Sequence, residues 1–544
     1  MAEPKHRIEP DHESTGWPPG VPYIIGNEAA ERFSFYGMRA ILYVHLAALY
    51  QLTGVVVERS KDLGTSDAHL FITGVYALPM IGAIFADRLF GKYPMIIGLS
   101  LVYCLGHAVL AVAENSLGGM HLGLGLIALG AGGIKPCVSA HVGDQFGKRN
   151  WFRVRTVFQI FYFSINFGSA FATILIPRVR EAFGTGVAFG IPGVLMFVAT
   201  FAFWLGRHKF VHVPPKPGGK LGLLDAISGT FLFLTFGHLF FTSSESIWII
   251  LVCSATSLVV GLVIFAIRQR IEPDDGFLAV SLHSVYALVR RVKPASASAE
   301  AAGAEGEAGD RPRWATSGFW APAVERFGAT VVEGPVAVVK VVTVFFMVSF
   351  FWALFDQHSS SWIRQASLMD LHVGGTKLLP SEIPALNPFM VMLLIPIMNL
   401  VYKGVERVGI RATPLRRMSV GMFVAALSFA VVAILQGRIN AGGEGTVSIL
   451  WQILPYLILT TSEVMVSITG LEFAYTQAPK RMKSTLMGFW LLTVALGNVL
   501  VALLARFGGL ALADFFWVFA GLMTVAAALF ALRAAFYTYQ DYSQ

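Results

Sequence analysis

Runs of apolar residues recur along the whole chain, and short polar stretches separate them. A helix needs about 20 mainly apolar residues to cross the hydrocarbon core of a bilayer, so runs of this length indicate transmembrane helices. The pattern predicts fourteen such helices. They lie near residues 24–50, 67–88, 93–113, 119–142, 154–176, 186–206, 222–242, 246–268, 336–362, 384–404, 416–436, 447–470, 484–506 and 510–534.

The composition is that of a membrane protein with many spans. Of the 544 residues, 55% are hydrophobic and 14% are charged, whereas soluble domains carry about 25% charged residues. The net charge of +8 would suggest nucleic acid in a soluble protein, but here loop residues carry it, and we expect no nucleic-acid partner. Cys104, Cys137 and Cys253 lie in apolar segments and show neither a disulfide framework nor a zinc spacing.

The distribution of basic residues predicts the orientation of the helices. Lys and Arg gather in loops of one parity, including 144–155, 403–417 and 480–483. The positive-inside rule places these loops and both termini in the cytoplasm. The first 20 residues are polar and proline-rich and contain no apolar core, so we expect no cleavable signal peptide.

The longest polar stretch, residues 270–335, divides the predicted helices into two sets. Its middle is rich in Ala, Gly and Glu, which predicts a flexible cytoplasmic linker. Two six-helix bundles joined in this way are the plan of a major facilitator fold, which is all-α and polytopic. The expected domains are a cytoplasmic tail (1–21), an N-terminal six-helix bundle (22–206), two additional transmembrane helices (222–268), the linker (270–335), a C-terminal six-helix bundle (336–534) and a cytoplasmic tail (535–544).

Four charged residues interrupt the first apolar segment: Glu28, Glu31, Arg32 and Arg39. A charge in hydrocarbon costs at least about 2.5–3.5 kcal/mol, so its presence there indicates a function. Their spacing puts all four on one helical face, which predicts a polar interior cavity. A carboxylate beside an arginine holds or releases a proton depending on its neighbours. This cluster therefore indicates proton-coupled transport.

Two further charges lie in the middle of apolar segments. Lys135 could snorkel to the cytoplasmic surface, or it could face the cavity and pair with Glu31 or with a substrate carboxylate. Glu463 has no positive neighbour in sequence, and it would be a natural anchor for an ammonium group.

These residues belong to longer motifs that resemble the proton-dependent oligopeptide transporter (POT) family of the major facilitator superfamily. The second half is most similar to the animal di- and tripeptide transporters, and the inserted helices at 222–268 are similar to those of bacterial members. The motifs are the E-x-x-E-R-F pattern from Glu28 to Phe33, GAGGIKPCVSAHVGDQF (130–146), FYFSINFGS (161–169), FFWALFDQHSSSW (350–362), GLEFAYTQAP (470–479) and MGFWLLTVALGN (487–498).

The resemblance implies a function and a set of site residues. The expected protein is a monomeric proton symporter that imports di- and tripeptides by alternating access across the plasma membrane, which is the inner membrane in a bacterium. Peptide-like compounds are further candidate substrates. Its coupling ion is the proton, and no cofactor is expected. The implied proton-coupling residues are Glu28, Glu31, Arg32, His69 and Asp356. The implied substrate-binding residues are Tyr36, Arg39, Tyr76, Lys135, Asn166, Trp352, Asn387, Glu463 and Trp490.

Some alternatives stay open at this point. His69 could be a satisfied polar residue, although histidine titrates near neutral pH. Asn387 precedes Pro388 and could mark a helix start. The protein could transport another small solute such as nitrate on the same fold, although Glu463 would repel an anion, or it could be a peptide sensor that does not transport. We do not expect an enzyme, because the sequence shows no P-loop, metal-ligand cluster or G-x-S-x-G motif.

Overall fold

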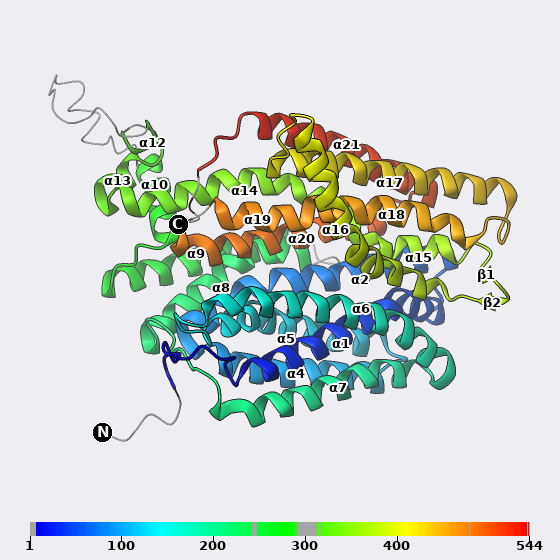
Figure 1. Cartoon of the computed structure of the whole chain (residues 1–544), viewed down its shortest axis with the longest axis horizontal. Coiled ribbons are helices and arrows are strands. Elements are labelled where there is room, and N and C mark those ends of the chain that lie inside the picture. The colour runs from blue at the N-terminus through cyan, green and yellow to red at the C-terminus, as the bar shows by residue number, and fades with distance from the viewer. Residues whose placement is uncertain are drawn as a thin grey trace.

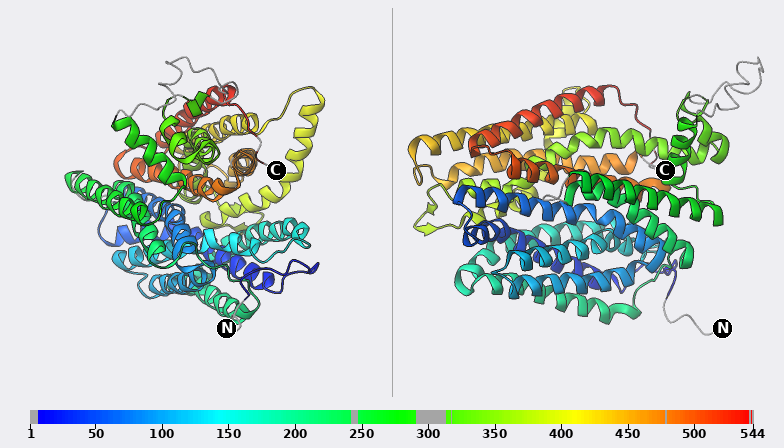
Figure 2. Two further views of the ribbon diagram at one scale, coloured as in Figure 1. Left: turned by 90° about the vertical axis from the view of Figure 1, so that its left-hand side faces the viewer. Right: turned by 180° about the vertical axis from the view of Figure 1, so that it is seen from behind.

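The computed structural model describes residues 7–241, 247–290, 313–316, 318–477, 479–540 and 542. Its long helices run roughly side by side and form two groups, one from each half of the chain (Figure 1). The left view of Figure 2 looks along the helices and shows the two groups beside each other. Both termini lie at the same end of the molecule (Figure 1).

The first bundle contains six spans, of which the second is built from two α-helices and a π-helical turn (Ala86–Phe90). Gly91, with φ of +85°, ends that turn and starts the next helix. The helices are α1 (Val21–Leu52), α2 (Val57–Ala77), α3 (Pro79–Phe85), α4 (Lys92–Val112), α5 (Leu117–Gly143), α6 (Val154–Phe183) and α7 (Thr185–Leu205).

The second bundle repeats this plan with more interruptions. Its first span is followed by a two-stranded antiparallel hairpin, β1 (His372–Val373) and β2 (Thr376–Lys377), whose turn uses Gly374 and Gly375 at positive φ. The helices are α14 (Ala329–Phe355), α15 (Ser361–Ala366), α16 (Leu386–Arg407), α17 (Pro414–Gly442), α18 (Ile453–Glu463), α19 (Thr469–Thr476), α20 (Lys483–Phe507) and α21 (Leu512–Ala535).

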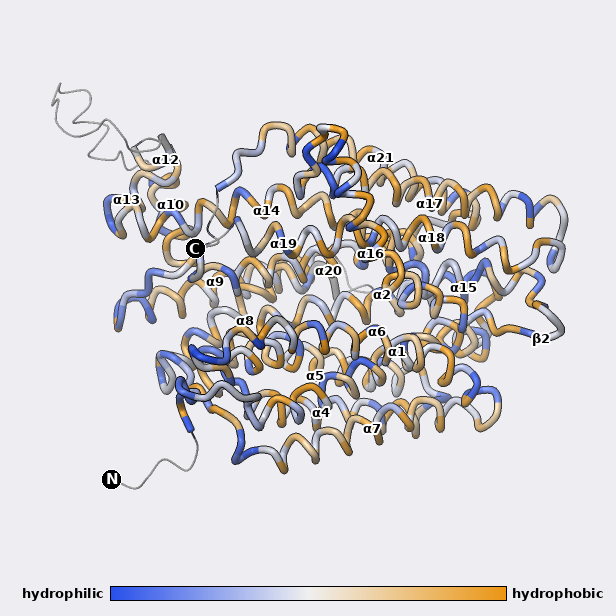
Figure 3. Tube along the Cα trace, viewed as in Figure 1, coloured by the Kyte–Doolittle hydropathy of each residue, from blue (hydrophilic) through white to orange (hydrophobic). Residues whose placement is uncertain are grey.

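The helices suit a membrane by length and composition. Among the described residues, 13 helical stretches are long and apolar enough to span one. The 32-residue helix α1 carries the four charges noted above and is the fourteenth span expected from the sequence. Hydrophobic residues prevail along the helices, and hydrophilic ones gather at their ends and in the loops (Figure 3). The second span begins earlier than predicted, at Val57 instead of residue 67.

Each bundle has a hydrophobic core of its own. One core joins buried residues between Val21 and Phe210, and the other joins buried residues between Val338 and Phe530. Helices α2 and α20 pack against each other across the boundary between the bundles. The bundles are therefore separately stabilised bodies that meet along a limited set of helices.

The two additional helices, α8 (Gly219–Phe241) and α9 (Ile247–Ile271), form a hairpin that docks on the first bundle. Asp225 of α8 pairs with Arg268 of α9 at 2.6 Å and with Arg88 at 3.6 Å. Gly222 passes so close to the backbone of Arg88 that a Cβ there would lie 1.8 Å from its carbonyl oxygen. The α8–α9 hairpin is thus fixed to the π-helical turn at the end of the second span.

The linker predicted over residues 270–335 needs a correction at both flanks. Helix α10 (Phe277–Val289) and helix α13 (Ala321–Phe327) pack together and against α14, which begins at Ala329 instead of residue 336. The short helix α12 (Arg313–Thr316) adjoins them. Apolar residues in these flanks, such as Val280 and Ala323, are buried together, and the low-complexity composition of the middle obscured them. Residues 291–312 lie outside the described residues, so the flexible linker stays a prediction there.

Glycine permits a close approach between α3 and α5 in the first bundle. A Cβ on Gly82 would lie 2.3 Å from the carbonyl oxygen of Gly132 and 2.9 Å from the Cα of Gly133. Both contacts are with backbone, which cannot rotate away. Gly125 lies on the same helix α5, but a Cβ there would meet no described atom within 4 Å.

We expect Gly82→Ala to lower the thermal stability of the purified protein and Gly125→Ala to leave it unchanged or raise it slightly. Overpacking costs about 1–3 kcal/mol, whereas Ala at an open helix position is favoured over Gly by about 0.5–1 kcal/mol. The apparent unfolding temperature in detergent, followed by tryptophan fluorescence, measures both effects. If Gly82→Ala unfolds at the wild-type temperature, α3 and α5 do not approach this closely.

Candidate functional site

A cluster of charges occupies the interior of the first bundle, where α1 meets α5. The Arg32 Nε lies 2.7 Å from Glu28 Oε1 and 3.0 Å from Glu31 Oε2. The Lys135 Nζ lies 3.5 Å from Glu31 Oε1. Two carboxylates and two cations therefore balance one another within an apolar body, so none of these buried charges lacks an opposite charge nearby.

Burial decides between the two orientations considered for Lys135. Its side chain is 6% exposed, and the ammonium lies over the rings of Phe35 and Tyr76, at 4.7 and 5.5 Å from their centroids. Lys135 therefore points into the bundle and does not snorkel to the surface. Glu31 is fully buried between Lys135 and Arg32, so any change in its charge would disturb both cations.

A second polar network crosses from the first bundle to the second. The Arg39 Nη2 lies 2.6 Å from Asp356 Oδ1, and Arg39 Nε donates to the Ser359 hydroxyl at 2.8 Å. The Asn498 Nδ2 donates to Asp356 Oδ2 at 2.7 Å. His69 Nδ1 lies 2.6 Å from Asn498 Oδ1. Arg39, Asp356 and His69 were selected from the sequence, and the structure brings all three together.

Sequence reasoning missed Ser359, Ser360 and Asn498. The other ring nitrogen of His69, Nε2, lies 2.7 Å from the Ser360 hydroxyl, so His69 uses both of its polar atoms across the boundary. A signal was present for Asn498, because an asparagine inside an apolar run needs a partner. Nothing in the sequence could show that this partner belongs to helix α2 or to the 3₁₀ turn after α14.

Further ion pairs join the two bundles at the same end of the molecule as the Arg39–Asp356 pair. The members come from α2 and α6 in the first half and from α15, α20 and the turn before α16 in the second. The pairs are Arg178–Glu382, with Nη2–Oε2 at 2.8 Å, Arg364–Glu58 at 2.6 Å, Arg364–Asp62 at 2.8 Å and Arg506–Asp67 at 3.5 Å.

These pairs show which end of the molecule is closed. The ion pairs named above, which join the bundles directly, lie from Arg39 outward, toward the end opposite the termini. Figure 1 places α15, β1 and β2 at that end. The bundles are therefore held together directly at one end. At the other end, Arg481 of the second bundle pairs at 2.7 Å with Asp275, whose neighbour Asp274 lies 3.9 Å from Arg88 of the first bundle.

Glu463 of the second bundle is hydrogen-bonded to an amide instead of being paired with a cation. The Asn387 Nδ2 donates to Glu463 Oε2 at 2.7 Å and to the Thr460 hydroxyl at 3.2 Å. Asn387 lies in the first turn of α16, but the residue that caps this helix is Ala385, so the side chain of Asn387 serves Glu463 and not the helix start. A π-helical turn (Val464–Ile468) follows Glu463 directly, and such turns often mark functional sites.

The aromatic residues selected from the sequence divide between the two bundles. Trp352 and Trp490 meet edge to face at 6.1 Å, and Trp490 packs over Gly470, where a Cβ would lie 2.3 Å from the ring. Tyr76 lies under the Lys135 ammonium, and Tyr36 packs against Phe35 at 5.3 Å. Asn166 is buried, and its amide donates to the Tyr162 carbonyl one turn earlier in α6, which leaves its oxygen available.

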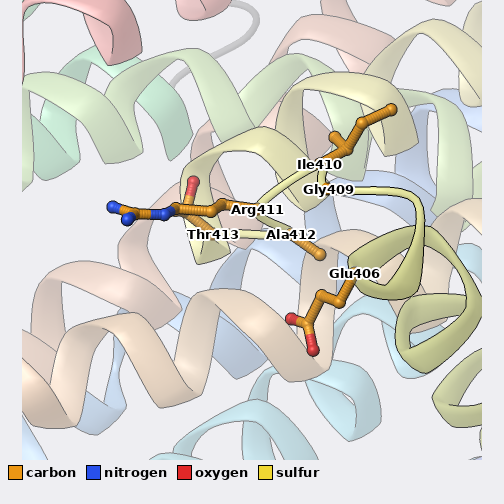
Figure 4. Close-up of a pocket in the computed structure, with 6 residues that line it drawn as sticks. All are labelled: Glu406, Gly409, Ile410, Arg411, Ala412 and Thr413. Atoms are coloured by element: carbon orange, nitrogen blue, oxygen red, sulfur yellow. The ribbon is translucent and has the colours of Figure 1, made fainter.

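Neither a metal-ligand cluster nor the pocket between α16 and α17 offers an alternative functional site. Within the described ranges, no three His, Cys, Asp or Glu residues gather as a metal ion would require. A pocket of about 440 Å³ lies in the loop between α16 and α17, around Glu406, Ile410 and Arg411 (Figure 4). The end of α16 and the loop that follows it form this pocket, far in sequence from the buried charges, so we assign it no part in the site.

Comparison with known proteins gives the same family in both halves. A family model described as "PTR2: POT family" matches residues 93–241 and 317–511. Solute carrier family 15 member 2 from Homo sapiens is 32% identical over 473 residues, which are 84% of this chain and 54% of the human protein. The chain thus spans about half the length of this curated relative.

Solved structures resemble the whole fold. The crystal structure of an auto-inhibited POT family peptide transporter is 36% identical, with a TM-score of 0.76 over 97% of this chain and 99% of that one. The in meso structure of the POT family transporter PepTSo is 39% identical, with a TM-score of 0.73 over 96% and 98%. The polytopic all-α fold and the family resemblance expected from the motifs are confirmed. Because the family model matches more than half of the chain and covers both bundles, this chain belongs to the POT family of membrane transporters.

Proposed function

We propose that this protein is a proton-coupled symporter of di- and tripeptides that works by alternating access. The observation that carries the proposal is the network of Arg39, Asp356, Asn498 and His69, in which titratable groups hold the two bundles together. The names of its relatives support peptides as the substrate class.

The end that carries both termini faces the cytoplasm in this proposal. The basic loops 144–155, 403–417 and 480–483 support that orientation by the positive-inside rule. The end closed by inter-bundle ion pairs then faces outward, and the conformation described here is closed to the outside. A plasma membrane location and a monomeric state go with this proposal.

Proton binding would weaken the closed end. Asp356 holds Arg39 through its negative charge, so a proton on Asp356 removes the ion pair and leaves an arginine that needs a new partner. A proton on His69 turns both ring nitrogens into donors, and Asn498 Oδ1 and the Ser360 hydroxyl can both accept, so these two hydrogen bonds persist. It is therefore the proton on Asp356 that lets the bundles separate at the outer end more easily than before.

A bound peptide can provide new partners for charged side chains that lose their own partners when a proton binds. Arg39 and Lys135 belong to the first bundle and suit a peptide carboxylate, whereas Glu463 belongs to the second and suits a peptide ammonium. A zwitterionic peptide would therefore bridge the bundles. When its carboxylate binds Lys135, Glu31 loses a cation and becomes easier to protonate. Asn387 and Asn166 can bind the peptide amide groups, which every peptide shares.

Dialanine uptake into proteoliposomes tests the function directly. We expect accumulation that requires an inward proton gradient and that a protonophore abolishes. One net charge moved inward at 100 mV supplies about 2.3 kcal/mol, or about fiftyfold accumulation before any pH gradient. A peptide sensor would bind dialanine without accumulating it, and a nitrate transporter would accumulate nitrate instead. Equal accumulation without a gradient would overturn proton coupling.

The replacement Glu463→Gln tests the role of Glu463 at the peptide ammonium. The amide oxygen can still accept from Asn387, but the charge is gone. We expect the affinity for free dialanine to fall by about 30-fold or more, since losing one partner of a buried pair costs at least about 2 kcal/mol. N-acetyl-dialanine, which lacks the ammonium, should bind the mutant and the wild type equally. Glu444→Gln, an exposed carboxylate of a loop, is the control. A uniform loss for both peptides would refute the assignment.

The replacement Asp356→Asn tests the coupling network. An amide of the same shape cannot release a proton or balance the charge of Arg39. Gradient-driven accumulation of dialanine should be lost, while exchange of labelled for unlabelled dialanine across the liposome membrane should persist. Asp370→Asn, whose side chain is 41% exposed ahead of β1, serves as the matched control. If Asp356→Asn concentrates dialanine as the wild type does, Asp356 is not a coupling group.

A further inference from the structure

A groove of about 610 Å³ lies between α1, α6 and α7, apart from the charged interior. Small residues of α1 and α6 form much of its lining, including Gly26, Ala29 and Gly168. Phe167 stacks between two other phenylalanines of α6 along its side, with centroids at 5.8 and 6.4 Å, and this ring is 57% exposed. The lining residues are Pro22, Tyr23, Gly26, Asn27, Ala29, Ala30, Phe33, Phe163, Ser164, Phe167, Gly168, Phe171, Leu195, Val198, Ala199 and Ala202.

The length of the groove matches one leaflet of a bilayer. On α1 its lining runs from Pro22, beside the first residue of the helix, to Phe33. At 1.5 Å per residue this distance is about 16 Å, and half of the hydrocarbon core is about 15 Å. The groove therefore reaches from the membrane interface at the end that carries the termini to about the middle of the membrane.

A buried amide is part of the lining of this largely apolar groove. Asn27 is 1% exposed, and neither its Oδ1 nor its Nδ2 has a hydrogen-bond partner among the described residues. A polar group left in this state is costly, so a ligand that pairs with it is favoured. Asn27 lies six residues after the start of α1, which places it about 9 Å along the helix. A ligand here needs a hydrogen-bonding group between a head and an apolar chain.

The mouth of the groove is positively charged. Lys209 Nζ donates to the Tyr23 hydroxyl at 2.7 Å and lies 4.7 Å from the centre of the Tyr23 ring. Among the described residues, no carboxylate pairs with Lys209. Basic pockets between transmembrane helices at the cytoplasmic side suit anionic lipid head groups.

We propose that this groove binds one anionic phospholipid of the cytoplasmic leaflet, an inference that rests on the orientation proposed above. The phosphate head group lies at Lys209, an ester carbonyl accepts from Asn27 Nδ2, and one acyl chain lies along the small residues of α1 and α6. The head, ester and chain of the lipid follow the same order as the basic mouth, the amide and the apolar groove.

Native mass spectrometry of the purified full-length protein tests the site. The probes are 1-palmitoyl-2-oleoyl phosphatidylglycerol and the phosphatidylcholine with the same chains, each added to delipidated protein. Gly26→Leu fills the groove, because a Cβ there meets no described atom within 4 Å. Gly521→Leu adds the same side chain at an equally open position of α21 and is the control. Asn27→Leu removes the amide, and elution as a single symmetric peak shows that each variant is folded.

We expect one retained phosphatidylglycerol on the wild type and on Gly521→Leu, and none on Gly26→Leu or Asn27→Leu. Lys209→Ala should lower the preference for phosphatidylglycerol over phosphatidylcholine about fivefold. Equal retention of both lipids would mean an ordinary boundary lipid and would overturn the proposal. So would retention on Gly26→Leu equal to that on Gly521→Leu, or no retained lipid at all. Because the readout is binding, these outcomes do not depend on whether the protein transports peptides.

Discussion

The structure depends on one electrostatic constraint: a charge inside an apolar body needs a partner there. An unpaired buried charge is so costly that removing one member of a buried pair destabilises a protein by about 3–5 kcal/mol. Arg39 and Asp356 satisfy the constraint across a sequence distance of 317 residues. Glu31 satisfies it with two cations inside the first bundle. The positions of the buried charges therefore determine which helices must stay together.

Because of this constraint, the polar network determines how the two bundles are held together. Each bundle has an apolar core of its own. Between the bundles, α2 packs on α20, α6 contacts α16, and Ile363 is buried against Tyr43 and Ala47. Ion pairs and hydrogen bonds on one side add to these contacts. Polar contacts of this kind respond to a proton or to a competing charge, whereas an apolar core does not. A protein built in this way can change the relation between its halves without unfolding either.

Much of this arrangement could be predicted from the sequence, because hydrophobic length and misplaced charge are local signals. The spans and the candidate residues Glu31, Lys135 and Glu463 follow from them. Pairing between distant residues is not a local signal, and so Asn498 and Ser360 were missed although they bind His69. The helices beside the linker were missed for a different reason, because their apolar faces are short and border a long polar stretch. The resemblance to a family supplied roles for Asn387 and Trp490 that no pattern in this chain could have shown.

The same constraint orders the steps of the proposed mechanism. If a proton neutralises Asp356, Arg39 is left as an unpaired buried cation until another anion reaches it. The carboxylate of an arriving peptide is such an anion, and the ammonium of the same peptide can replace Asn387 as the partner of Glu463. A protein with the proton but without the peptide is then disfavoured, because Arg39 has no anion to pair with. A protein with the peptide but without the proton is also disfavoured, because Arg39 is still paired with Asp356 and cannot take the peptide carboxylate as its partner. Coupling between proton and peptide thus needs no separate device, since the requirement that buried charges be paired links the two.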